Sequence, residues 1–450
     1  MPDHPVATLP LDPGAMADAA RRCLDYAKKR GASDAEVEVS AAVGQSVTVR
    51  RGEVETVEYN RDKGLGITVY FGQKRGNAST SDLSPEAIER SVDAACAIAI
   101  HTAEDPAAGL PDAGRLFRGD APDLDLFHPW ALTVEEAIDI ARRAEAAALA
   151  VDRRITNSEG GTVAAYDTDF ILANTRGFLS GFANSKASIG VAVVAEDAGG
   201  MQRDYWYTTH RDPKRLENAE LTGRIAGERT IARLGGRRLP TTQAQVLFDA
   251  NIAGSLVSHF VSAASGSSLY RRSSFLLDRL GSQVFAPMID IREDPHLPGE
   301  LASGYYDAEG VTTTARNIVE GGILKGWFLS SYSARKLGLE TTGNAGGNHN
   351  LIVKPGEHDL AGLVKLMGRG LLVTELMGQG VNSVTGDYSR GAAGFWVEHG
   401  AIQFPVEEVT IAGNLLDMFH GIQAIGRDVL VRGSKHAGSI LIDRMTIAGD

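Results

Sequence analysis

Hydrophobic positions in the first hundred residues follow two spacings, one typical of helices and one typical of strands. Apolar residues recur every three or four positions within residues 16–30 and again within 88–99. Ser84-Pro85-Glu86 precedes the second stripe and is typical of a helix N-terminus. Between the two stripes, residues 37–71 alternate apolar and polar, which predicts four strands with a turn at 51–53.

The same two spacings continue through the middle of the chain. Thr133 and Glu136 form a capping-box pattern that begins an alanine-rich helix to about Ala150. Short strands are expected over 155–209, interrupted at Gly160-Gly161, Arg176-Gly177 and Gly199-Gly200. A helix over about 216–234 then ends at a further pair of glycines.

The last two hundred residues are mostly short β-like runs separated by glycine turns. Helices are expected only near 252–264 and 360–367. We therefore predict an α+β protein with an N-terminal helix/antiparallel-sheet region and a β-rich C-terminal domain. We expect an N-terminal α/β segment at 16–103 and a Pro/Asp-rich linker or extended crossing segment at 104–130. A central α/β segment at 131–236 and the β-rich domain at 241–450 follow.

Composition limits the classes of partner. With 45 basic and 57 acidic residues the formal charge is −12, which disfavours direct contact with nucleic acid. No run of about 18 apolar residues is present, so we expect no contact with a membrane. The two cysteines, Cys23 and Cys96, are expected to be reduced thiols in helices of a cytoplasmic protein.

The chain carries no local metal-binding motif. None of its eleven histidines is followed by Glu, and no two of them lie within five residues of each other. A Gly-x-Ser-x-Gly nucleophile motif and a phosphate-binding loop are also absent from the sequence. Among the charged residues, Asp387 and Arg390 are the first candidates. They are either a substrate site or a structural ion pair that holds a turn.

One long block is specific enough to indicate a family. Residues 386–398, continuing through 405–414, resemble the PmbA (TldE) branch of the TldD/PmbA metalloprotease family. Similar stretches lie at 52–55, 65–70, 120–129, 155–161, 331–339 and 373–380. The resemblance covers about residues 33–449. It implies a bacterial cytosolic protein tied to zinc-dependent peptide degradation.

The resemblance also implies where a metal site would lie. In the sister TldD branch a helix carries His-Glu-x-x-x-His, and a further Cys helps to hold zinc. Anchoring on Tyr270-Arg271-Arg272 places the three motif positions at Ser258, His259 and Ala263, and the corresponding Cys is also missing. We therefore expect no zinc in this chain and interpret His259 as a core or interface histidine. The zinc is expected in a TldD-like partner.

The leading interpretation is a subunit of a TldD–TldE heterodimer that cuts unfolded or extended peptides inside a closed chamber. This chain would close the chamber and hold the substrate along an exposed strand edge of its C-terminal half. Two alternatives stay open: a stand-alone peptidase with an unrecognised site, and a regulatory protein-binding factor of the DNA gyrase modulator type. The apolar runs of 370–414 predict open edges that pair with the partner, or form a homodimer when the partner is absent.

Overall fold

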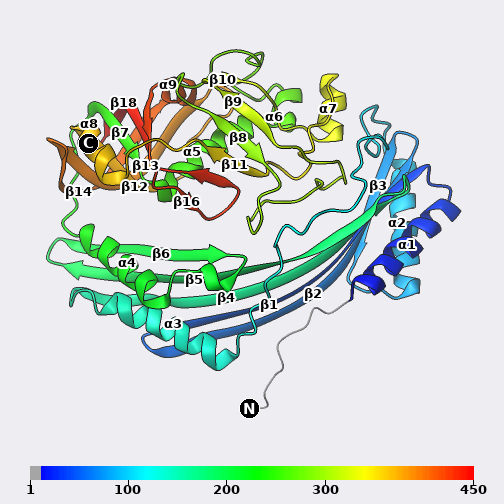
Figure 1. Ribbon diagram of the computed structural model, residues 1–450, viewed down its shortest axis with the longest axis horizontal. Coiled ribbons are helices and arrows are strands. Elements are labelled where there is room, and N and C mark those ends of the chain that lie inside the picture. Colours follow the sequence, from blue (N-terminus) through cyan, green and yellow to red (C-terminus); the bar gives the residue numbers. More distant parts are fainter. Residues whose placement is uncertain (1–11, 450) are drawn as a thin grey trace.

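The computed structural model describes residues 12–449 and confirms the predicted α+β class. Figure 1 shows two bodies. One is a long, curved antiparallel sheet with helices along its outer face. The other is a β-rich body that lies over the opposite face of that sheet.

The first body contains a single six-stranded sheet with the order β3-β2-β1-β4-β5-β6. Its strands are β1 (Asp34–Arg50), β2 (Glu53–Phe71), β3 (Lys74–Thr80), β4 (Ile155–Asn174), β5 (Leu179–Asp197) and β6 (Gly200–His210). Because β1 pairs with β4 from Glu36↔Asn174 to Val49↔Gly161, the segments 16–103 and 131–236 contribute to the same sheet.

Four helices cover one face of this sheet in two pairs. They are α1 (Pro13–Lys29) and α2 (Pro85–His101) at one end, and α3 (Val134–Leu149) and α4 (Ala219–Ala232) at the other (Figure 1). Strand β1 runs under both helix pairs, and its alternate side chains point toward them. Val37 and Val39 pack against α1 and α2, whereas Val47 and Val49 pack against α3 and α4. A short 3₁₀ helix, η1 (Pro213–Arg215), follows β6.

Two expectations about these strands are wrong. Residues 37–71 form two long strands of 17 and 19 residues instead of four short ones, joined by the predicted turn at Arg51-Gly52. Their polar middle continues as strand because β1 is hydrogen-bonded on both sides, to β2 and to β4. Gly161 lies inside β4 and not in a break: a Cβ there would lie 2.3 Å from the carbonyl oxygen of Ala141, so glycine allows close approach of α3.

The second body contains two six-stranded sheets. The sheet with the longer strands has the order β14-β13-β12-β7-β18-β15. Because β14 also pairs with β18, five of its strands form a closed ring. Its strands are β7 (Thr242–Phe248), β12 (Gly370–Met377), β13 (Asp387–Glu398), β14 (Ala401–Asn414), β15 (Ile422–Ile425) and β18 (Ile440–Ala448). The smaller sheet runs β10 (Ile323–Leu324), β9 (Arg316–Glu320), β8 (Ile291–Asp294), β11 (Asn350–Val353), β17 (Lys435–Ala437) and β16 (Leu430–Val431).

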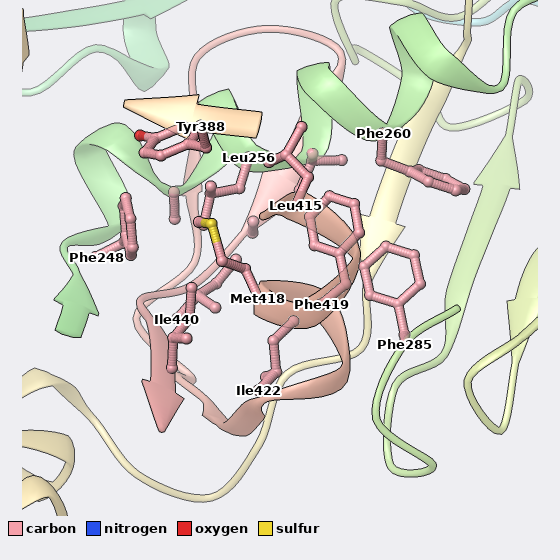
Figure 2. Close-up of a cluster of buried hydrophobic side chains, with 14 of the residues drawn as sticks. Phe248, Leu256, Phe260, Phe285, Tyr388, Leu415, Met418, Phe419, Ile422 and Ile440 are labelled. Carbon is pink, nitrogen blue, oxygen red and sulfur yellow. The ribbon is translucent and has the colours of Figure 1, made fainter. Parts of the chain in front are cut away.

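Helix α5 (Ala250–Ala263) supplies much of the core of this body. Figure 2 shows its Leu256 and Phe260 packed with Phe285, Met418 and Phe419, and Phe260 meets Phe285 edge to face at 5.1 Å. The other helices are α6 (Gly266–Tyr270), α7 (Ser331–Leu337), α8 (Leu360–Met367), which has its predicted bounds, and α9 (Leu415–His420). The largest hydrophobic core of the described residues therefore packs against the buried face of α5.

Much of the open edge expected for residues 370–414 is covered by other strands. Residues Thr410–Ala412 of β14 pair with β18, and backbone hydrogen bonds join Pro405 and Glu407 to Arg237. Two large aromatic side chains of this region, Trp396 and Phe419, are buried in the core and so do not form a surface for a partner. The closure of the sheet on itself removes much of the reason given for pairing through these strands.

Residues 104–130 are an extended crossing segment without helix or named strand. The segment is bound to α7 of the second body: the Arg335 guanidinium donates to the carbonyl oxygens of Ala107 and Gly109 at 3.1 and 2.9 Å. Asp105 accepts from Tyr332 and Lys336, both at 2.7 Å, and these bonds lower the pKa of Asp105 to about 2. The segment thereby ties the two bodies together. No helix between residues 12 and 449 is both long enough and apolar enough to cross a membrane.

Candidate functional site

A cleft of about 560 Å³ lies where the edge strand β6 meets the second body. Tyr205 and Tyr207 of β6 form one wall, and their rings lie parallel with centroids 6.3 Å apart. The opposite wall comes from the first half of α5, the end of β12, Arg390 of β13 and the segment 430–437. A cleft of this size, between two bodies, is the usual setting of a ligand site.

Helix α5 presents a polar face to this cleft. It begins at Asp249, whose side chain accepts from the backbone N–H of Asn251. Its apolar residues face the core, whereas Ser255 and Ser258 line the cleft. The Ser258 hydroxyl donates to the carbonyl oxygen of Gly254 at 2.9 Å, and the Ser255 hydroxyl is buried with no hydrogen-bond partner.

The three residues of the degenerate motif have different surroundings. Ser258 lines the cleft, His259 is half-buried beside it, and Ala263 is fully buried in the core. The His259 ring meets the Tyr388 ring edge to face at 5.9 Å, and its Nε2 has no hydrogen-bond partner. Burial, and then the nearby Arg390, lower the pKa of His259, so its neutral form is favoured.

These residues do not fit a zinc ion. Across the part of the chain that the structure describes, no three His, Cys, Asp or Glu side chains come together as metal ligands. At the motif itself, a hydroxyl and a buried methyl group stand where the resemblance would place histidines, which leaves one imidazole. A catalytic zinc needs about three protein ligands.

Asp387 and Arg390 do not form the ion pair considered above. They lie three positions apart on β13, so their side chains point to opposite faces of the strand. Asp387 is exposed and accepts from the Thr385 hydroxyl at 2.6 Å, at the turn before the strand. Arg390 lines the cleft, and its Nε is buried without a partner. Of the two, only Arg390 belongs to the candidate site.

A group of ion pairs joins the two bodies at one side of the cleft. Arg233, the residue directly after α4, contacts Glu375 of β12 at 2.5 Å and Asp204 of β6 at 3.8 Å. Arg229 contacts the same Asp204 at 3.3 Å. The two carboxylates that line the cleft, Asp204 and Glu375, are therefore already paired with arginines.

The sequence did not reveal two basic residues of the cleft, Arg432 and Lys435. The Arg432 guanidinium lies 4.0 Å from the ring centroids of both Trp206 and Tyr207. Its Nη1 donates to Asn251 at 2.5 Å, and its Nη2 is buried with no partner. The only local signal was a pair of basic residues flanking Gly-Ser, which does not indicate contact with a strand more than 200 residues earlier.

Family models cover most of the chain. Those described as PmbA/TldA metallopeptidase domain 1, central domain and C-terminal domain match residues 35–99, 127–234 and 241–449. The chain is 50% identical over 420 residues to Metalloprotease PmbA of Escherichia coli O157:H7, covering 93% of each chain. It is 46% identical to a PmbA homologue of Haemophilus influenzae, over 95% of this chain and 94% of that one.

Solved structures share the fold. A Bacteroides thetaiotaomicron protein described as a candidate modulator of DNA gyrase superposes with a TM-score of 0.92 at 27% identity, over 96% of this chain and 98% of that one. TldE of Thermococcus kodakarensis has a TM-score of 0.83 at 20% identity, over 96% and 100%, which shows the fold alone. The two bodies thus correspond to the three domains of the PmbA/TldA metallopeptidase models. The chain belongs to the PmbA/TldD family, in its PmbA branch.

Proposed function

We propose that this chain is the PmbA/TldE-type subunit of a two-chain zinc metalloprotease that degrades unfolded or extended peptides. In this proposal a TldD-like partner holds the zinc, and this chain holds the substrate and closes the chamber. The observation that carries the proposal is the face of α5: Ser258, His259 and Ala263 stand at the motif positions and provide no ligand set.

The cleft wall supports a substrate-holding role. Strand β6 is an edge strand of its sheet, and its Tyr205 and Tyr207 line the cleft. An extended peptide can add to such an edge through main-chain hydrogen bonds, which need little side-chain identity. The proposal therefore moves the substrate edge from the C-terminal half, where the sequence had suggested it, to β6.

The division of chemistry follows from the ligand set. A bound zinc in the partner would polarise the scissile carbonyl and lower the pKa of a water molecule. The residues of this chain bind and orient the peptide and exclude bulk water from the cleft. The proposal keeps the cytoplasmic location and the absence of direct nucleic-acid or membrane contact expected from the composition.

Reconstitution tests this function. The chain is purified alone, the TldD-like chain of the same host is purified alone, and each is incubated with an unfolded peptide before the two are mixed. We expect cleavage that appears with the mixture, is sensitive to a chelator, and is absent from this chain alone. Chelator-sensitive cleavage by this chain alone, free of contaminating protease, would favour the stand-alone peptidase and refute the proposal.

One observation favours a second candidate. The Bacteroides neighbour, at 27% identity, is described as a candidate modulator of DNA gyrase, so a regulatory protein-binding role is the alternative. Co-purification from the native host separates the two: a TldD-like chain as the main partner supports the protease, and gyrase subunits without a TldD-like chain support the regulator.

A further inference from the structure

Three cations line the cleft without a direct ion pair. Arg390, Arg432 and Lys435 reach it from β13, from the turn before β17, and from β17 itself. Among residues 12–449 none of the three forms an ion pair, because the carboxylates of the cleft, Asp204 and Glu375, pair with arginines at the end of α4. The cleft therefore has an excess of positive charge, although the chain as a whole carries −12.

These cations are partly removed from water, which makes their lack of partners costly. Arg432 lies between Trp206 and Tyr207, and one of its terminal nitrogens is buried without a hydrogen-bond acceptor. Burial also lowers the pKa of Lys435. An uncompensated buried cation is unfavourable unless an acceptor or an anion satisfies it. The aromatic walls partly offset the cost through cation–π contact.

Further polar atoms without partners lie at the base of the cleft. The Nε of Arg390 and the hydroxyl of Ser255 belong to residues that line the cleft, and both atoms are buried and have no hydrogen-bond partner. Donors that are preorganised around an open volume, and not satisfied by the protein itself, are typical of a ligand site.

We propose that this cleft binds a carboxylate, supplied by the C-terminus or an acidic side chain of a peptide, with Arg390, Arg432 and Lys435 as its cationic partners. The peptide as source rests on the proposed function, whereas the anion site rests on the cleft alone. A carboxylate and not a phosphate is proposed because the substrate in the proposed function is a peptide. The parallel rings of Tyr205 and Tyr207 offer apolar surface beside it for the rest of a peptide.

The test uses the full chain, purified alone, and four probes. These are tetra-alanine with a free C-terminus, its C-terminal amide, an N-acetylated Ala-Glu-Ala amide, and inorganic phosphate. Binding is measured by calorimetry and by the change in intrinsic tryptophan fluorescence, to which Trp206 beside Arg432 contributes. We expect the two carboxylate peptides to bind at least about tenfold more tightly than the amide, as the loss of a charge-assisted pair predicts. Which of the two binds more tightly identifies the source of the carboxylate.

Variants assign the binding to this cleft. Arg432→Gln and Lys435→Gln, each made singly and checked for folding by circular dichroism, should each weaken carboxylate binding about tenfold. Lys28→Gln, an equal change in charge at an exposed position of α1, should leave it unchanged. If neither cleft variant alters binding, or if neither carboxylate peptide binds better than the tetra-alanine amide, the proposal is overturned.

The remaining outcomes are also decisive. Phosphate that binds more tightly than either peptide, with the same dependence on Arg432, would replace the carboxylate assignment with a phosphate site. Carboxylate binding by the lone chain, together with failure of the reconstituted pair to cleave, would refute the proposed function and leave the anion site standing. Cleavage by the reconstituted pair without carboxylate binding by this chain would support the proposed function and refute the anion site.

Discussion

A buried carboxylate in the second body offers a sharp test of the structure. Glu293 of β8 is 1% exposed and accepts from three donors: Arg316 Nε at 3.0 Å, Asn344 Nδ2 at 2.8 Å and the His349 backbone N–H at 2.9 Å. Strand β8 pairs with β11, and β11 pairs with β17, which carries Lys435 of the cleft. The substitution Glu293→Gln keeps the shape and removes the charge.

The expected loss follows from these contacts. Removing one partner of a fully buried ion pair costs about 3–5 kcal/mol. Arg316 is one-fifth exposed and keeps acceptors on Trp327 and Asn344, at 2.8 and 2.9 Å. These remaining bonds place the expected loss in the free energy of unfolding at about 2–4 kcal/mol. The new amide N–H₂ also faces a donor, which prevents full recovery.

Urea denaturation followed by tryptophan fluorescence measures the effect, and the neighbouring residue supplies the control. Arg292 lies on the other face of β8 and is half exposed, with Asp294 at 3.7 Å. Arg292→Gln should therefore cost about 0–1 kcal/mol. We expect a clearly lower midpoint for Glu293→Gln only. Equal midpoints for the two variants would show that Glu293 does not stabilise the second body as inferred.

Two further predictions concern stability. Burial first, and then Glu309, raise the pKa of Glu36 to about 7; because the folded state keeps this proton, stability falls as pH rises from about 4.5 to about 7. The Glu36→Gln variant should therefore have a free energy of unfolding about 1–3 kcal/mol higher than the parent at pH 8, and a much smaller gain at pH 4.5. Thermal denaturation at both pH values measures this, and an equal gain at both would contradict it. A Cβ at Gly223 would lie 1.9 Å from the Ala144 carbonyl oxygen, so Gly223→Ala should lose about 2 kcal/mol or more by forcing α3 and α4 apart. Gly254→Ala, in α5 with its nearest atom at 3.9 Å, should instead gain about 0.5–1 kcal/mol; denaturant midpoints that move in the same direction would refute the contrast.

Features with local causes were predictable from the sequence. Ser84 and Thr133 cap α2 and α3 as expected, and α8 has its predicted bounds, because a cap or a short amphipathic stripe is decided within a few residues. The continuity of β1 and β2 was not predictable, since it depends on pairing with β4 more than a hundred residues later. The closing pair β14–β18 is non-local in the same way.

In the candidate site, too, residues with a local sequence signal were predictable and residues placed by distant contacts were not. The resemblance led to Ser258 and His259, and Arg390 was identified from its position in the specific block, although the partner suggested for it was wrong because strand geometry separates it from Asp387. Arg432 and Lys435 were missed because their role depends on the docking of segment 430–437 against β6 of the other body. The spacing of residues along the chain contains no signal for such a contact.

The central claim is that this chain works without a metal of its own, and its zinc content tests that claim most directly. The isolated chain is dialysed mildly and analysed for zinc, beside a His259→Ala variant and beside the complex with a TldD-like partner. The account predicts no stoichiometric zinc in the isolated chain and about one zinc per pair in the complex, held by the partner. About one zinc per isolated chain, lost in the His259→Ala variant, would contradict it.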